Sequence, residues 1–241
     1  MKMKDIIKRL IPSKYHAYLV RIKNNFLDGY ALKSYSQEGE DIVLHRIFET
    51  QKGGFYVDVG AFHPKRFSNT YFFYKRGWMG INIEPNPDNF KLFKRYRKRD
   101  INLQIGISDK EGLLTYFMFN EPALNTFDEH VAERSSRNSE QFYLIRKVKI
   151  RVQRLDDVLN QVLPIGKTID FMSIDTEGHD INVIESNDWN RFRPKVLLIE
   201  DIGKNISDIY QSKIHIFLTE KNYYLFAKTV NTLIYKDSKQ N

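Results

Sequence analysis

The fold of this chain is decided by Phe55-Tyr56-Val57-Asp58-Val59-Gly60-Ala61-Phe62-His63. The first five residues are mostly apolar and predict a buried strand, which ends in an acid and a glycine. A second predicted strand, Ile81-Asn82-Ile83, follows and ends in Glu84. A carboxylate at the tip of the second strand of an α/β unit can accept hydrogen bonds from both hydroxyls of a ribose. The two acids therefore predict a nucleoside-bearing cofactor on an open parallel sheet.

The residues after Gly60 indicate which cofactor to expect. They are Ala-Phe-His-Pro, so the second and third glycines of the dinucleotide-binding G-x-G-x-x-G pattern are missing. Without those glycines the backbone cannot closely approach a diphosphate. The sequence therefore favours S-adenosylmethionine, which has a ribose and no phosphate, over the cofactor of a hydride-transferring dehydrogenase.

Composition narrows the class of protein further. The 241 residues suffice for one large α/β domain, and the absence of cysteine excludes disulfides, thiolate nucleophiles and cysteine-ligated metals. No apolar run approaches the ~20 residues of a membrane span, so a cytoplasmic protein is expected. The net charge of +8 fits a nucleic acid, an anionic substrate, a membrane surface, or simply solubility.

The alternation of strands and helices predicts a doubly wound α/β fold with a mostly parallel seven-stranded sheet. Strands are expected at residues 55–59, 79–83, 101–107, 169–174 and 196–199, and helices at 69–76 and 87–97. The end of the chain, 223–228 and 232–235, predicts an antiparallel hairpin, which is typical of methyltransferases and not of dinucleotide dehydrogenases.

Two segments do not fit this alternation, so the expected division is an accessory segment at 1–34 and a methyltransferase domain at 35–241. Residues 1–34 predict helices with one apolar and one basic face, which would lie on an anionic membrane surface or pack against the domain or a partner chain. We therefore expect peripheral contact with the inner face of the membrane through residues 1–30, and a homodimer. Residues 110–154 predict an insertion or substrate flap.

Acids gather where the strands end, although the chain as a whole is basic. Ligands of open α/β sheets bind beyond the carboxyl ends of the strands. A carboxylate-lined edge suits the sulfonium and ammonium of S-adenosylmethionine and would repel a diphosphate. The alternative is that several of these acids only cap helices. The acids expected at this edge are Asp58, Glu84, Asp109, Asp175, Glu177, Glu200 and Asp201.

Together these motifs resemble the FkbM family of S-adenosylmethionine-dependent methyltransferases. The resemblance extends over about residues 35 to 201 and is carried by Tyr35-Ser36-Gln37 with Glu40-Asp41, the 55–64 stretch, Ser68-Asn69-Thr70, Gly77-Trp78-Met79-Gly80, Ile83-Glu84-Pro85-Asn86-Pro87 and the 169–178 stretch. It implies a class I, Rossmann-like methyltransferase fold and methylation of a hydroxyl on a sugar, polyketide or related metabolite. The expected setting is surface-glycan (polysaccharide) or secondary-metabolite biosynthesis.

The resemblance also implies roles for individual residues. Gln37 and Asp41 would close over the cofactor, and Asp58 and Gly60 would contact its amino-acid end. Glu84 would hold the ribose, and Ser108 with Asp109 would lie at the adenine. Asp175 and Glu177 would face the transferred methyl.

Methyl transfer to a hydroxyl requires alignment and removal of a proton. The expected base is His179, with His63 second, because each follows a strand of the sheet. A metal is the rival means of activating the hydroxyl. Asp175, Glu200 and Asp201 follow neighbouring strands and offer hard oxygen ligands for Mg²⁺, Mn²⁺ or Ca²⁺.

Two other functions stay open at this point. The run 91–99 has six basic residues with aromatics between them and would suit an RNA methyltransferase, although the same pattern describes a solvated helix face. Nucleic acid is therefore not the expected partner, and a small molecule or sugar is. The other alternative is a non-catalytic scaffold of a glycan-synthesis complex.

Overall fold

The computed structural model describes residues 12–137, 141–203 and 205–239. The chain divides into two units, Met1–Ser34 and Tyr35–Asn241. The described part of the first unit holds a short 3-10 helix, η1 (Ser13–Tyr15), and helix α2 (His16–Phe26). The helical pattern expected for residues 1–11 lies outside the described residues.

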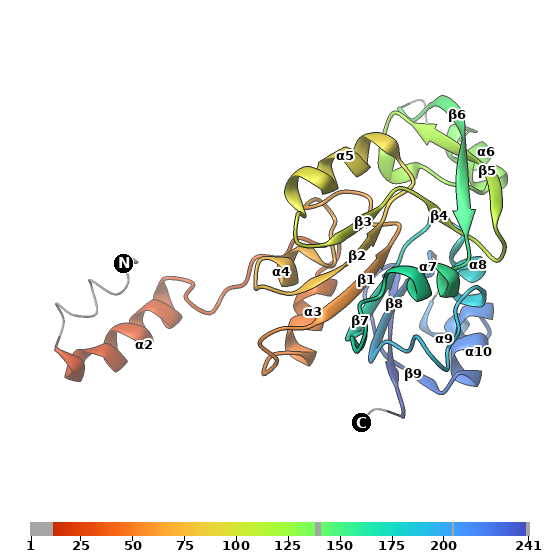
Figure 1. The fold of residues 1–241 in the computed structure, drawn as a ribbon. Helices are drawn as coiled ribbons and strands as arrows, with labels where there is room; N and C mark the ends of the chain where they lie inside the picture. Colours follow the sequence, from red (N-terminus) through yellow and green to blue (C-terminus); the bar gives the residue numbers. More distant parts are fainter. Residues whose placement is uncertain (1–11, 138–140, 204, 240–241) are drawn as a thin grey trace. The chain divides into compact units, whose positions relative to one another are not determined.

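The second unit contains the alternating strands and helices that the sequence predicts (Figure 1). Its helices are α3 (Glu40–Ile47), α4 (Tyr71–Tyr74), α5 (Pro87–Tyr96), η2 (Pro122–Leu124), α6 (Glu129–Arg137), α7 (Leu155–Val162), α8 (Asp180–Glu185), α9 (Ile206–Ile209) and α10 (Lys213–Glu220). Its strands are β1 (Phe55–Val59), β2 (Met79–Ile83), β3 (Ile101–Leu103), β4 (Gly106–Ile107), β5 (Gly112–Phe119), β6 (Leu144–Gln153), β7 (Phe171–Ile174), β8 (Val196–Glu200), β9 (Tyr223–Lys228) and β10 (Thr232–Asp237).

Seven strands form the main sheet in the order β3-β2-β1-β7-β8-β10-β9. The first five are parallel to one another, and β10 pairs antiparallel with both β8 and β9. This confirms the doubly wound, mostly parallel seven-stranded sheet with a C-terminal antiparallel hairpin. It follows that β1, β2, β7 and β8 end at one edge of the sheet.

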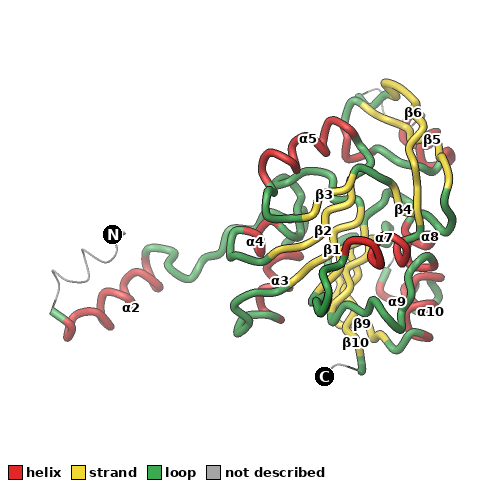
Figure 2. The backbone as a smooth tube through the Cα atoms, viewed as in Figure 1, coloured by secondary structure: helices red, strands yellow, loops and turns green. Residues whose placement is uncertain are grey.

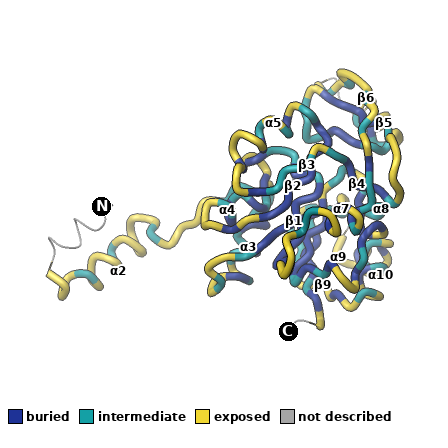
Figure 3. The backbone as a smooth tube through the Cα atoms, in the orientation of Figure 1, coloured by how far each residue is buried: buried dark blue, intermediate teal, exposed yellow. Residues whose placement is uncertain are grey.

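Each face of the sheet carries its own hydrophobic core, because successive residues of a strand point to opposite faces. On one face, Val57 and Ile174 lie in a cluster with residues of α7, α8 and α10. On the other face, Tyr56 and Phe171 lie in a cluster with residues of α3 and α4. Figures 2 and 3 show the result: strands that are buried between layers of helix.

One expected strand, 101–107, is two strands in the structure. β3 pairs with β2 at the edge of the main sheet, whereas β4 pairs with β6 in a second sheet of order β4-β6-β5. The chain leaves the main sheet between them and passes close to the 110–154 segment: a Cβ at Gly106 would lie 2.6 Å from the Phe127 ring. The expected helix at 69–76 is also shorter, with one turn at α4.

Candidate active site

A pocket opens where the parallel strands end, and most of the expected cofactor residues line it. Gln37, Asp58, Gly60, Glu84, Asp175 and Glu177 are all part of its wall. The 110–154 segment contributes a second group, Tyr116, Pro122, Ala123, Asn125 and Phe127. The segment expected to be a substrate flap thus forms part of the pocket that the cofactor residues line.

Gly60 lets two strand ends approach each other in the wall of the pocket. Its φ is +75°, and an added Cβ would lie 1.8 Å from the Asp175 carbonyl oxygen. Only glycine adopts this conformation without a steric penalty at such a distance. The N–H groups of Gly60 and Ala61 both donate to the Ile83 carbonyl, which ties the end of β1 to the end of β2.

A buried chain of hydrogen bonds orients the Asp58 carboxylate. The Thr70 hydroxyl donates to Asp58 Oδ2 at 2.7 Å, and the Arg97 guanidinium donates to Thr70 Oγ1 at 2.9 Å. Arg97 is fully buried and pairs with Asp100 at 2.8 Å, which also accepts from the Tyr56 hydroxyl. Burial raises the pKa of Asp58 to about 6, against the opposing effects of Thr70 and Arg97.

Glu84 is buried at the tip of β2 and faces the pocket. Its Oε1 accepts a hydrogen bond of 2.7 Å from the Asn86 N–H, which fixes the carboxyl group. Burial raises the pKa of Glu84 to about 8, and the charge of Asp58 acts in the same direction. A cation or a hydrogen-bond donor bound in the pocket would favour the ionised form of this acid.

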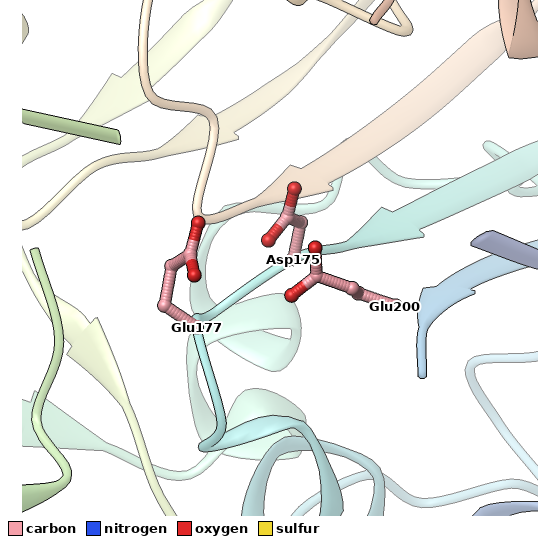
Figure 4. A group of neighbouring side chains, drawn as sticks. All are labelled: Asp175, Glu177 and Glu200. Carbon is pink, nitrogen blue, oxygen red and sulfur yellow. The ribbon is translucent and has the colours of Figure 1, made fainter. Parts of the chain in front are cut away.

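A group of three carboxylates forms beside these two acids. Asp175 directly follows β7, Glu177 lies in the next loop, and Glu200 ends β8; one oxygen of each lies within 4.8 Å of the others (Figure 4). Loss of hydration and the neighbouring acids raise the pKa of all three. At neutral pH this group therefore retains a proton or attracts a cation.

The three-carboxylate group differs from the expected metal set in one member. Asp201 is not part of the group that Asp175 and Glu200 form, and Glu177 takes its place. Asp201 follows the last residue of β8, and adjacent residues of an extended chain point to opposite sides. The Asp201 N–H donates to the Asn231 carbonyl beside the hairpin. In the sequence, the position of Glu177 only two residues after Asp175 was the signal that could have placed it in this group.

A second, smaller hollow adjoins the pocket. The two share Gln37, Phe67, Asn69 and Asp175 in their walls. The rest of the smaller wall is mostly polar and comes from the 38–40 loop, the end of β8 and the turn before β10. Asn69 Oδ1 is buried with no hydrogen-bond partner among the described residues. A molecule in this hollow would lie next to one in the pocket.

Gln37 and Asp41 have different positions despite their shared motif. Gln37 lines both hollows, as a residue that closes over a ligand would. Asp41 is fully buried, and its carboxylate accepts from the Tyr35 N–H and the Ser36 hydroxyl. Among the described residues it lines neither hollow, and its hydrogen bonds to Tyr35 and Ser36 shape the loop that carries Gln37.

Ser108, Asp109 and His179 form a small group next to the pocket, behind Phe127. The Ser108 hydroxyl lies 3.0 Å from Asp109 Oδ1 and 3.0 Å from His179 Nε2, and the His179 ring packs on Phe127. Burial lowers the pKa of His179, although Asp109 and Asp128 oppose the shift. The expected adenine residues, Ser108 and Asp109, are not part of the pocket wall, but they directly follow Gly106 and Ile107, which are.

The two histidines expected as bases, His179 and His63, lie outside the walls of both hollows. Among the described residues that line the two hollows there is no histidine. His179 is directed toward Ser108, and His63 Nδ1 accepts from the N–H groups of Lys65 and Arg66. Position after a strand places a residue at the correct edge but does not set the direction of its side chain. The geometry therefore does not support the expectation of a histidine base.

Sequence reasoning missed two kinds of site residue. Thr70 and Arg97 reach Asp58 from 12 and 39 positions along the chain, and no local pattern connects them. Tyr116 lies in β5 and Phe127 in the loop before α6, and no local pattern in the sequence predicts that their rings come within 4.6 Å of each other in the pocket wall.

Comparison with known proteins identifies the family. The model of the FkbM methyltransferase domain matches residues 58–225, which is more than half of the chain. Among solved structures, a protein from Klebsiella pneumoniae described as an O-methyltransferase has a TM-score of 0.43 and 9% identity, over 97% of this chain and 94% of that chain. A methyltransferase from Geobacter sulfurreducens has a TM-score of 0.40 and 11% identity, over 97% of this chain and 95% of that chain. No curated protein matches. On the strength of the domain match, the chain belongs to the FkbM methyltransferase family.

Proposed function

We propose that this methyltransferase binds S-adenosylmethionine in the pocket and transfers its methyl group to a hydroxyl of a sugar or other small molecule. One observation carries the proposal: the described residues of the pocket wall include four acids, Asp58, Glu84, Asp175 and Glu177, and no Lys, Arg or His. Such a wall attracts a cationic ligand and repels a diphosphate.

The wall offers a complementary group for each part of this cofactor. Glu84 can accept from the ribose hydroxyls, and Asp58 from the ammonium group, since both carboxylates are fixed by neighbouring donors. The apolar side formed by Ile107, Tyr116 and Phe127 suits a flat base. When bound, S-adenosylmethionine supplies an electrophilic methyl; the residues of the chain bind it, orient it and exclude water.

The smaller hollow is the proposed position of the acceptor. Asn69 and Asp175 belong to both walls, so an acceptor hydroxyl there would lie near the proposed cofactor. Asn69 Oδ1 and the carboxylates of Asp175 and Glu200 are acceptors, which suits a ligand with several hydroxyl groups. A neutral sugar or polyol, as a surface-glycan component or a secondary metabolite, is the acceptor class that we propose.

The three-carboxylate group is the proposed means of activating the acceptor. Its ligand set is all oxygen, which suits Mg²⁺ or Mn²⁺, and such a cation held by Asp175, Glu177 and Glu200 would polarise the hydroxyl. Without a cation, the raised pKa of this group makes one carboxylate a base effective near neutral pH. Activity after chelation, with and without added Mn²⁺, separates these two routes.

Calorimetry tests the cofactor assignment. We expect S-adenosylhomocysteine to bind and NAD not to bind. Asp58→Asn and Glu84→Gln should abolish binding, whereas Glu220→Gln, on the exposed end of α10, should not change it. Binding of NAD, or no binding of either compound, would contradict the proposal. Mass spectrometry for one added methyl group over a panel of neutral, amino and phosphorylated sugars then tests the acceptor class.

A further inference from the structure

The charge of this protein is concentrated in its first unit. Residues 1–34 contain eight Lys or Arg and two Asp, a net charge of +6 out of the +8 of the whole chain. The other 207 residues, which include the methyltransferase pocket, are close to neutral at +2. A solubility function would not require this distribution, whereas a localised electrostatic contact would.

Helix α2 combines that charge with an apolar stripe. Tyr18, Leu19, Ile22 and Phe26 follow the spacing that places residues on one side of a helix. No residue of α2 is buried (Figure 3). Tyr18 and Phe26 are 59% and 78% exposed. Within the described part of its own unit nothing covers the stripe, and an uncovered apolar surface of this kind marks a contact with a partner or a membrane.

Basic side chains border the stripe on both sides. At 100° per residue, Arg21 and Lys23 lie on opposite flanks of the line through Leu19, Ile22 and Phe26. Both are exposed, and Lys14 is also exposed just before the helix. Long basic side chains in this position can keep their charge at a polar surface while the stripe lies deeper.

We propose that α2 is an interfacial helix that lies on a bilayer containing anionic lipid. The apolar stripe would enter the boundary between headgroups and acyl chains, with Tyr18 near the headgroups. Arg21 and Lys23 would contact lipid phosphates. Within the described residues, no helix has both the length and the hydrophobicity needed to span a bilayer.

Charge distinguishes this partner from the alternatives. A second copy of the segment would bring two segments of charge +6 together, and these would repel each other. The rest of the chain, at +2, offers little electrostatic attraction for a basic helix. An RNA would use the basic residues but would leave the apolar stripe in water. Of these three partners, only an anionic bilayer uses both the basic charge and the apolar stripe of α2.

Co-sedimentation of the full chain with vesicles tests the proposal. We expect binding to phosphatidylcholine vesicles that contain phosphatidylglycerol, weak binding to pure phosphatidylcholine, and loss of binding as salt is raised. Each removed charge should weaken binding about fivefold, so Lys14→Gln, Arg21→Gln and Lys23→Gln together should weaken it about 100-fold. The matched control is Lys94→Gln, Arg95→Gln and Lys98→Gln, on or beside the exposed face of α5, which should have little effect.

A second variant tests the stripe. Leu19→Ser with Phe26→Ser should also weaken vesicle binding and should leave the circular-dichroism melting curve unchanged, because neither residue is buried. Equal binding to the two kinds of vesicle, or binding to neither, would overturn the proposal. Light scattering tests the remaining alternative, that the stripe binds a second copy of the chain. If the wild type is a dimer and the Leu19→Ser, Phe26→Ser variant is a monomer, the stripe is a dimer interface.

Discussion

At the scale of single residues, the state of Asp58 depends on one hydroxyl. The Arg97 guanidinium has no acceptor, so Thr70 Oγ1 must accept from Arg97 and can donate its own hydrogen to Asp58. This direction is set by the chemistry of Arg97. The chain of bonds therefore orients the Asp58 carboxylate and favours its charged form.

Thr70→Val removes this donor at nearly constant volume. We expect a further rise in the pKa of Asp58, which burial already raises to about 6. Loss of a hydrogen bond to a charged group should weaken S-adenosylhomocysteine binding by about 10- to 100-fold. The loss should be largest near that pKa and smaller at higher pH, where the carboxylate ionises in both proteins.

Thr70→Ser keeps the hydroxyl and is the control for this prediction. It should bind the cofactor product as the wild type does at each pH. Calorimetric titrations over a series of pH values measure both variants. An equal loss of affinity at every pH would mean that Thr70 acts only through packing.

His179 offers a second prediction at this scale. Because its ring contacts Ser108 and Phe127 beside the pocket, His179→Ala should raise the KM for S-adenosylmethionine severalfold and leave kcat nearly unchanged. His63→Ala should change neither, since His63 bonds only its own loop among the contacts described. Steady-state kinetics measures both. A fall in kcat with constant KM for His179→Ala would restore this histidine as the base.

At the scale of elements, the 110–154 segment contributes to two structures at once. β5 and β6 pair with each other, and β6 also pairs with β4, the strand that the chain forms directly after it leaves the main sheet. The loop between β5 and α6 then returns to the pocket, where the Thr126 hydroxyl donates to the Glu177 carbonyl. This bond ties the segment to the loop that carries one of the three clustered carboxylates.

Phe127→Ala tests the segment as a wall of the cofactor pocket. Removal of an aromatic wall should weaken S-adenosylhomocysteine binding about tenfold, because base–aromatic contacts typically contribute about 1 to 3 kcal/mol. Tyr143→Ala, in the same segment but 60% exposed, is the matched control and should bind normally. If both variants bind like the wild type in calorimetry, the segment does not hold the cofactor.

At the scale of the whole molecule, the pocket acids oppose folding at neutral pH. Glu84 has its pKa raised from 4.5 to about 8, so its contribution to stability is full below about pH 4.5 and is lost as pH rises toward 8. Asp58 acts in the same direction with a folded pKa of about 6. A cationic cofactor would offset this cost by pairing with the ionised acids.

Thermal melting over pH measures this cost. Glu84→Gln cannot titrate at this position, so its Tm should exceed that of the wild type by a margin that grows from about pH 4.5 to 8. Comparison of the two proteins removes the contributions of the other titrating groups, which both share. A margin that is constant over this range would mean that Glu84 titrates normally in the folded protein.

The sequence by itself determined the sheet and the residues at its edge. Apolar strands of known period place Asp58, Gly60, Glu84 and Asp175 where neighbouring parallel strands end, and the structure has them there. Strand position follows from local hydrophobic pattern, which can be read along the chain. The motifs at these ends also indicated the FkbM family, which the domain match confirms.

Only the tertiary structure decided which side chains meet. Glu177 instead of Asp201 completes the three-carboxylate group, and Arg97 reaches Asp58 through Thr70. The two histidines line neither hollow and bond Ser108 and the 65–66 backbone instead, and the chain leaves the main sheet after β3. The physical reason is the same in each case: the direction of a side chain, and the partner it reaches across long sequence separations, are set by packing in three dimensions and not by spacing along the chain.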